Sequence, residues 1–164
     1  MKSPKLLKGV ALALAILFAG AQVIRPAKTN PELAEKNALA SRLHVPSHVE
    51  AMLKRACYDC HSHSTQWPWY SSVAPVSWFV IDHVNEGRGH LNFSEWAKYD
   101  AKKAAHKLEE ICEMVQAGEM PLKSYLPLHP NARLSTEDVR ALCDWANEER
   151  TRVGFEVESQ EGVR

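Results

Sequence analysis

Apolar side chains recur at the spacing of an α-helix in three separate parts of the chain. Positions i, i+3, i+4 and i+7 are apolar in three groups: Val49, Met52, Leu53 and Ala56; Leu108, Ile111, Cys112 and Val115; and Val139, Leu142, Cys143 and Ala146. Each group covers one face of an amphipathic helix. Because no segment shows the sustained alternation of a half-buried strand, the pattern predicts an all-α fold.

Polar residues next to these groups predict where the helices begin and end. Ser47 and Glu50 have the spacing of a capping box, in which each side chain accepts a hydrogen bond from a free backbone N–H at the start of a helix. Ser94 and Ser135 are expected to cap the second and third helices, and Gly118 is expected to end the second.

Two segments outside these helices lack a firm apolar stripe. Residues 62–93 are rich in Ser, Pro, Gly and aromatic residues, and we expect mostly loop there, with a short helix at 77–85. So long a loop needs something to pack on, and a bound prosthetic group would meet that need. In residues 26–45 we expect a linker with a short helix from Pro31, capped by Asn30.

The first 25 residues have the charge pattern of an export signal. Three lysines, Lys2, Lys5 and Lys8, precede an uncharged run from Gly9 to Ile24. This order predicts that the rest of the chain crosses the cytoplasmic membrane. The small residues up to Ala21 fit a cleavage site, and retention as a membrane anchor through residues 6–24 is the alternative. We therefore expect a periplasmic protein, soluble or anchored to the inner membrane.

The remaining charges argue against a nucleic-acid partner. The chain has 20 basic and 20 acidic residues, and residues 26–164 contain 16 basic and 20 acidic residues. Binding to a phosphate backbone depends on clustered Lys and Arg, which this acidic body lacks. We expect four parts: a signal peptide or anchor at 1–25, a linker at 26–45, a compact domain at 46–150 and a flexible tail at 151–164.

The sequence Cys57-Tyr58-Asp59-Cys60-His61 is the C-x-x-C-H signature of covalent haem attachment. Two thiols at this spacing can reach the two vinyl groups of one haem, and the adjacent His can then coordinate the iron. The motif closes the first predicted helix of an exported chain, where such proteins mature. We therefore predict one covalent haem c per chain, with His61 as the proximal ligand.

Three other interpretations of these residues compete with haem. A zinc site could use Cys57, Cys60, His61 or His63, but no second closely spaced Cys/His pair follows. A dithiol redox motif would follow a strand in a βαβ unit, and none is visible. A simple disulfide would leave His61 and the aromatic loop without a role.

A longer set of motifs resembles one family. Besides the haem signature, the segments are 67–70 (Trp-Pro-Trp-Tyr), 74–78 (Ala-Pro-Val-Ser-Trp), 84–88 (Val-Asn-Glu-Gly-Arg), 91–96 (Leu-Asn-Phe-Ser-Glu-Trp) and 118–121 (Gly-Glu-Met-Pro). Together they resemble the small haem-binding domain family of bacterial, often membrane-anchored, c-type proteins, over about residues 45–149. The order of helices also resembles class I cytochromes c.

The resemblance implies that Met120 is the distal iron ligand. A His/Met pair raises the reduction potential, which suits electron transfer. Met120 could instead pack near the haem edge, leaving the iron five-coordinate or bound by another side chain. The candidates for that ligand are His83, His90, His106 and His129.

Several other residues are candidates for contact with the haem. Aromatic rings can cover a porphyrin face or form ordinary core, and the candidates are Trp67, Trp69, Tyr70, Trp78 and Trp96. Arg88 could pair with a propionate or remain solvated. The backbone carbonyl that orients the proximal His is expected from Pro75 or Pro68, as in class I cytochromes.

Cys112 and Cys143 occupy equivalent apolar positions on the last two predicted helices. In an oxidising compartment they could form a disulfide, and two buried thiols acting as small apolar groups are the alternative. The sequence leaves both open.

The sequence therefore predicts an all-α, cytochrome c-like domain with a single haem, carrying out one-electron transfer with redox partner proteins outside the cytoplasmic membrane. Such a protein is an electron carrier rather than an enzyme. The alternative is a haem-based sensor, ligand-binding or peroxidase-like protein with an open distal site.

Overall fold

The computed structural model describes residues 4–161, where all regular secondary structure is helical and no strand occurs, which confirms the predicted all-α fold class. The α-helices are α1 (Pro4–Ala21), α2 (Ser47–Ala56), α3 (Tyr58–His61), α4 (Val76–His90), α5 (Ala101–Gln116) and α6 (Thr136–Glu161). Short 3-10 helices connect them: η1 (Glu35–Asn37), η2 (Leu39–Ser41), η3 (Trp69–Ser72), η4 (Phe93–Lys98) and η5 (Pro130–Ala132).

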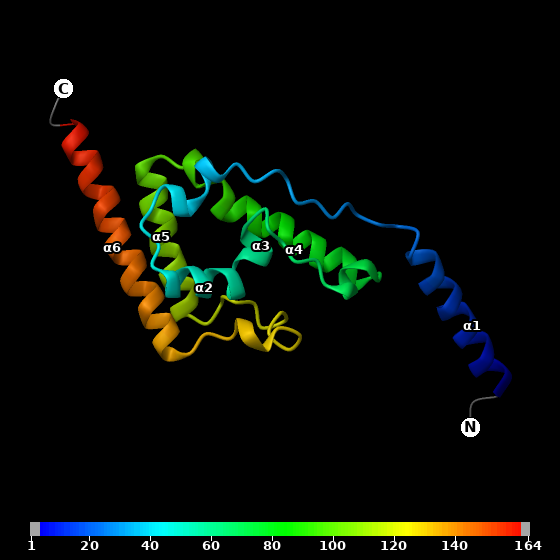
Figure 1. Cartoon of the computed structure of the whole chain (residues 1–164). Coiled ribbons are helices and arrows are strands. Elements are labelled where there is room, and N and C mark those ends of the chain that lie inside the picture. Colours follow the sequence, from blue (N-terminus) through cyan, green and yellow to red (C-terminus); the bar gives the residue numbers. More distant parts are fainter. Residues whose placement is uncertain (1–3, 162–164) are drawn as a thin grey trace.

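The hydrophobic core lies between α5 and α6, which run side by side, with α2 packed against them (Figure 1). Leu53 of α2, Leu108 of α5 and Leu142 of α6 are fully buried there. All three belong to the predicted apolar stripes. The spacing of apolar positions therefore identified the faces that form the core.

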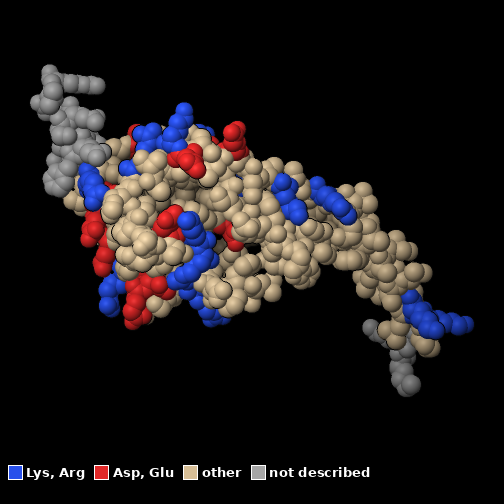
Figure 2. Space-filling model, viewed as in Figure 1, with Lys and Arg blue, Asp and Glu red and all other residues tan. Residues whose placement is uncertain are grey.

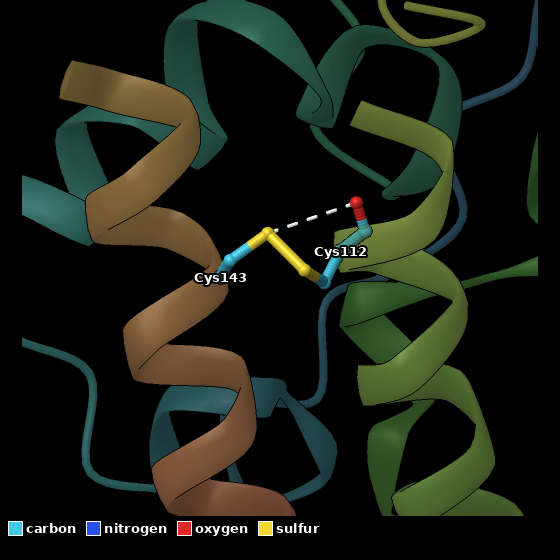
Figure 3. Close-up of a disulfide and its surroundings, with 2 residues drawn as sticks. All are labelled: Cys112 and Cys143. Carbon is cyan, nitrogen blue, oxygen red and sulfur yellow. Dashed lines mark hydrogen bonds between the residues drawn. A yellow bond between two sulfur atoms is a disulfide. The ribbon is translucent and has the colours of Figure 1, made fainter. Parts of the chain in front are cut away.

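A disulfide joins Cys112 of α5 to Cys143 of α6 across this core (Figure 3). The two Cα atoms are 4.8 Å apart, within the range that a disulfide spans. Of the two alternatives that the sequence left open, the structure has the bridge. It ties together two helices whose cysteines lie 31 residues apart.

Two of the predicted helix ends are confirmed. The Ser135 hydroxyl accepts a hydrogen bond from the Asp138 N–H, and the Asp138 carboxylate accepts one from the Ser135 N–H, at 3.1 and 2.9 Å. This reciprocal pair starts α6. Gly118 has a φ of +67°, a left-handed conformation that ends α5 without the steric cost of a Cβ.

Two predicted caps are wrong. Pro46 holds the cap position of α2, so Ser47 already lies inside the helix and makes no capping bond, while Glu50 pairs with Lys54. Ser94 does not start a helix that runs to Gly118.

Instead, Asn92 caps η4 and Asp100 caps α5, each through its side-chain oxygen. The Ser94 hydroxyl accepts a hydrogen bond from the His63 N–H. The helix expected between Ser94 and Gly118 is therefore divided into η4 and α5, because Asp100 caps the start of a new helix within it.

The segment between α1 and α2 contacts the body of the protein along much of its length. No helix begins at Pro31, and the Asn30 side chain bonds Thr65 and Arg88 instead of capping. Leu39 and Leu43 lie in the core. The hydrophobic core therefore begins within the segment expected as a linker.

Helices α4 and α6 are longer than their sequence patterns indicated. α4 extends from Val76 to His90, beyond the short helix expected at 77–85. α6 continues to Glu161, through most of the segment expected as a tail. α1 extends away from the body, and no residue of it is buried (Figure 1).

Candidate haem site

The C-x-x-C-H motif forms the turn that joins α2 to α3. Cys57 ends α2, where its N–H donates to the Leu53 carbonyl, and its own carbonyl accepts from the His61 N–H at 2.9 Å. Both Cys57 and Cys60 are half-buried and carry free thiols. One compact turn therefore presents two thiols and an imidazole within five consecutive residues.

The imidazole of His61 is oriented by two backbone carbonyls of the α4 segment. Its Nδ1 lies 2.9 Å from the Gly87 oxygen and 3.1 Å from the Leu91 oxygen. Both oxygens can only accept, so Nδ1 carries the proton and Nε2 keeps a free lone pair. This is the tautomer that a metal-bound imidazole requires.

The predicted orienting carbonyls, Pro75 and Pro68, do not contact His61. Pro68 instead accepts hydrogen bonds from Ser71, and the Pro75 carbonyl accepts from the Trp78 N–H. The end of α4 supplies the carbonyls in their place, because the helix-terminal carbonyl of Gly87 is shared between the Leu91 N–H and the imidazole. Burial lowers the pKa of His61, which favours the neutral ring.

Gly87 allows α4 to approach the motif closely. A Cβ atom at position 87 would lie 2.6 Å from the Cys60 oxygen, closer than real Cβ contacts. Only glycine therefore lets α4 place its carbonyl next to His61 at this distance. By contrast, a Cβ at Gly89 of the same helix would meet no atom within 4 Å.

A cavity of about 210 Å³ opens beside Cys60. The side chains that line it are mostly apolar and come from α4, from the loop before it and from the loop that follows Gly118, and Figure 2 shows a hollow on this side of the body. Three large apolar lining residues are exposed: Val76 at 46%, Phe79 at 66% and Leu128 at 62%. Large apolar groups around a hollow indicate a ligand with apolar faces.

The two thiols do not have the electrostatics of a redox-active pair. Burial raises the pKa of Cys57 to about 12, and burial together with the nearby Asp59 raises that of Cys60 to about 11. Dithiol oxidoreductases instead lower the pKa of the attacking cysteine. Both cysteines therefore carry protonated, weakly nucleophilic thiols at neutral pH.

Met120 lies partly buried against the hydrophobic core, and its N–H donates to the Met114 carbonyl. It is not one of the residues that line the cavity, although Leu122 and Ser124 of the same loop are. The structure thus brings Cys57, Cys60 and His61 together on one turn, and it places Met120 at the start of the loop that closes the cavity.

Of the alternative histidine ligands, His83 and His129 line the cavity. The His83 Nδ1 bonds the Phe79 carbonyl at 2.7 Å, which leaves Nε2 free. His106 lies on α5, exposed and paired with Glu110, and His90 is exposed at the end of α4.

The aromatic residues named as candidates have different environments. Tyr70 lines the cavity, whereas Trp96 lies in the core, stacked on Phe93. Trp69 is 78% exposed, and the Trp78 indole donates to the Ile24 carbonyl. Of the five, Tyr70 is the one that contributes to the cavity wall.

Arg88 is half-buried and makes hydrogen bonds within the protein, so it is not a fully solvated side chain, and its pairing with a propionate stays a prediction. Its guanidinium donates to the Ser62 carbonyl, the Thr29 carbonyl, the Asn30 side chain and the Thr65 hydroxyl, at 2.7 to 3.1 Å. Arg88 therefore fixes the loop directly after His61.

A hydrogen-bonded chain beside Cys60 was not predicted. The Tyr125 hydroxyl donates to the Asp59 carboxylate at 2.7 Å, and the Tyr125 ring stacks on His129 at 3.8 Å between centroids. Burial and the bond to Asp59 raise the pKa of Tyr125. The contact connects the motif to the loop after Gly118, and no local pattern in the sequence indicates it.

These residues fit a haem. The turn provides two thiols and an imidazole with Nε2 free, and an apolar cavity lies beside Cys60, although Cys57 and His61 do not line it; this donor set is that of a haem-binding protein. Among residues 4–161, no three His, Cys, Asp or Glu side chains are grouped to hold a metal ion by themselves.

The family comparison leads to the same class. The model of the haem-binding domain family matches residues 16–148, which is most of the chain. This protein belongs to the haem-binding domain family. Comparison with curated proteins and with solved structures found no match.

Proposed function

We propose that this protein is a c-type cytochrome with one haem, which transfers single electrons outside the cytoplasmic membrane. The observation that carries the proposal is the position of His61 on the same turn as two free thiols, with Nδ1 held by Gly87 and Leu91 and Nε2 left as a ligand. The cavity beside Cys60 gives a porphyrin an apolar environment.

Cys57 and Cys60 attach the haem as thioethers. Each thiol adds across one vinyl group, so that an S–H bond breaks, an S–C bond forms and the hydrogen passes to the neighbouring carbon. No atom is lost and no oxidant is needed. The mass of the product is therefore the sum of the polypeptide and one haem.

His61 and Met120 are the proposed axial ligands. When bound, the haem supplies an iron that exchanges one electron between Fe(II) and Fe(III). The thioether of Met120 is a soft ligand that favours Fe(II), and Arg88 and Gly87 hold the loop and the helix that position His61. The apolar side chains of the cavity exclude water from the iron.

The expected location is the periplasm, with redox proteins as partners. α1 is an apolar helix of 18 residues, long enough to be a signal or an anchor, and its lysines precede the apolar run. The exposed apolar side chains Val76, Phe79 and Leu128 at the cavity would let a partner approach the haem edge.

A second candidate function, a haem-based sensor or peroxidase-like protein with an open distal site, is favoured by one observation. Met120 packs against the core, whereas His83 and His129 line the cavity. In that case the iron would lack Met120 and would bind an added ligand.

The test compares the variants Met120→Ala, His83→Ala and His129→Ala with the unaltered holoprotein. We expect a low-spin spectrum for the unaltered protein, conversion to high spin with rapid CO binding in Met120→Ala, and no change in the histidine variants. An unchanged low-spin spectrum in Met120→Ala would show that Met120 is not a ligand of the iron. A high-spin spectrum in the unaltered protein would favour the open-site alternative.

A further inference from the structure

The segment that follows α1 is bound to the haem-binding body rather than free. We call residues 22–30 the strap. The Gln22 amide makes two hydrogen bonds to the backbone of residue 74, donating to the Ala74 carbonyl at 3.1 Å and accepting from the Ala74 N–H at 3.0 Å. The Trp78 indole donates to the Ile24 carbonyl at 2.8 Å.

The other end of the strap is held as firmly. Lys28 donates to the Ser72 hydroxyl, the Thr29 carbonyl accepts from Arg88, and the Asn30 side chain bonds both Arg88 and the Thr65 carbonyl. Gln22 directly follows the last residue of α1. The end of α1 therefore lies against the start of α4, with no slack chain between them (Figure 1).

An exposed apolar surface surrounds this junction. Val23, Ile24, Trp69, Val76 and Phe79 are 46 to 83% exposed, and they come from the strap, from η3 and from the first turn of α4. We call these five residues the junction patch. Their clustering is unusual for a surface in water, because large exposed apolar groups usually mark a contact site.

The strap and the segment that precedes α4 carry charges of one sign, and the nearest acidic residues are Asp59 and Asp82. Residues 60–81 contain no Asp, Glu, Lys or Arg, and the strap carries Arg25 and Lys28 with no acidic residue. Figure 2 shows basic but no acidic side chains on the visible face between the body and α1. A surface with exposed Trp, apolar groups and cations complements the interface of a bilayer that contains anionic lipid.

We propose that the junction patch, with Arg25 and Lys28, docks on the surface of the bilayer that α1 spans, and so fixes the mouth of the haem cavity toward the membrane. The inference rests on the proposed haem protein and on the retention of α1 as an anchor, the alternative to cleavage. The strap determines the orientation, because it leaves the body little freedom to turn away from the lipid. Val76 and Phe79 belong to both the junction patch and the cavity lining, so electron exchange takes place at the membrane surface.

The test uses the full-length holoprotein in vesicles of zwitterionic and anionic lipid. The single variant Trp69→Cys is labelled with an environment-sensitive fluorophore, and Glu113→Cys, at an exposed position of α5, is the matched control. The unaltered holoprotein takes up no label when Cys57 and Cys60 are thioethers and Cys112 is bridged to Cys143. Carbonate extraction first establishes that α1 is inserted.

We expect the label at position 69 to lose emission in vesicles with brominated acyl chains, compared with vesicles of unbrominated lipid, and the label at position 113 to lose none. Charge reversal in Arg25→Glu/Lys28→Glu should lower the ratio of docked to undocked protein by about tenfold or more in anionic vesicles. If α1 is inserted and the label at position 69 emits equally in brominated and unbrominated vesicles, the docking is overturned. Release of the protein by carbonate would overturn the anchor itself, and labelling of the unaltered holoprotein at Cys57 or Cys60 would overturn the thioether attachment.

Discussion

The two halves of the body bury their apolar side chains in different ways. In the first half, α5 and α6 pack against α2, with Leu108 and Leu142 fully buried and the disulfide between the helices. In the second half, formed by α3, α4 and the loop after Gly118, large apolar side chains such as Phe79 and Leu128 remain exposed around a cavity.

The difference indicates which half depends on the haem. The disulfide-linked half has its own core, and Trp145 and Glu149 of α6 also bind the backbone of His44 and so hold the preceding chain. The cavity half buries fewer apolar side chains, among them Ile81 and Val84 of α4, and a bound haem would add to its core. We therefore expect one core formed by protein alone and one completed by the haem.

The largest expected effect comes from the double variant Cys57→Ala/Cys60→Ala. It removes both thioether attachments, so no haem should remain on the polypeptide in a denaturing gel stained for haem. Hydrogen exchange should then increase in α4 and in residues 119–135, while α5 and α6 keep their protection. Equal loss of protection in both halves would show that they fold as one unit.

Removing the disulfide should affect the half that contains α5 and α6. Cys112→Ala/Cys143→Ala opens a bridge across 31 residues of sequence separation, which should lower the free energy of unfolding by about 3–4 kcal/mol. Denaturant titration of the holoprotein measures this loss. The haem spectrum in the absence of denaturant should not change, and a shifted spectrum would contradict the separation of the two halves.

Gly87→Ala should disturb the contact between α4 and the motif. The added methyl group would meet the Cys60 oxygen at 2.6 Å, and relieving this overlap should cost about 1–3 kcal/mol of stability and move the His61 ligand.

The matched control is Gly89→Ala, where a Cβ has free space. Because alanine favours a helix over glycine, this variant should gain up to about 1 kcal/mol. The reduction potential and the thermal midpoint should both change in Gly87→Ala, and the potential should stay constant in Gly89→Ala. Equal behaviour of the two variants would argue against a special role for Gly87.

The smallest expected effect is a pH dependence at the start of α6. The Ser135 N–H, with help from Arg55, lowers the pKa of Asp138. The carboxylate therefore contributes stability that is fully present above the ordinary carboxyl pKa of about 4 and is lost as the pH falls through the lowered folded value.

Asp138→Asn should reduce the slope of unfolding free energy against pH in the acidic range, with a loss of about 0.5–1 kcal/mol at neutral pH. The measurement is denaturant unfolding at several pH values. If the slope of unfolding free energy against pH is the same in the variant and the unaltered protein, Asp138 is not the source of the pH dependence.

Signals confined to neighbouring residues were visible in the sequence. The apolar stripes, the left-handed Gly118 and the cap at Ser135 involve residues within a few positions of one another, and each was predicted. The capping box at Ser47 failed although its spacing fits, because the preceding Pro46 takes the cap position. Local spacing alone does not decide which residue stands at the helix boundary.

The contacts around the site depend on segments far apart in the chain. The carbonyls that hold His61 come from positions 87 and 91, and the Arg88 guanidinium bonds residues on both the strap and the loop after His61. A backbone carbonyl has no sequence signature, and an arginine near a haem motif fits several roles. The motif identified the residues of the turn that presents two thiols and an imidazole, whereas the contacts that support this turn required the structure.

The central claim is that one haem is bonded to Cys57 and Cys60 and completes the cavity half. The intact mass of the purified protein, measured under denaturing but non-reducing conditions, tests it most directly. We expect the mass of the polypeptide plus one haem, in both the unaltered protein and Met120→Ala. A red protein that gives the mass of the bare polypeptide after denaturation would contradict it.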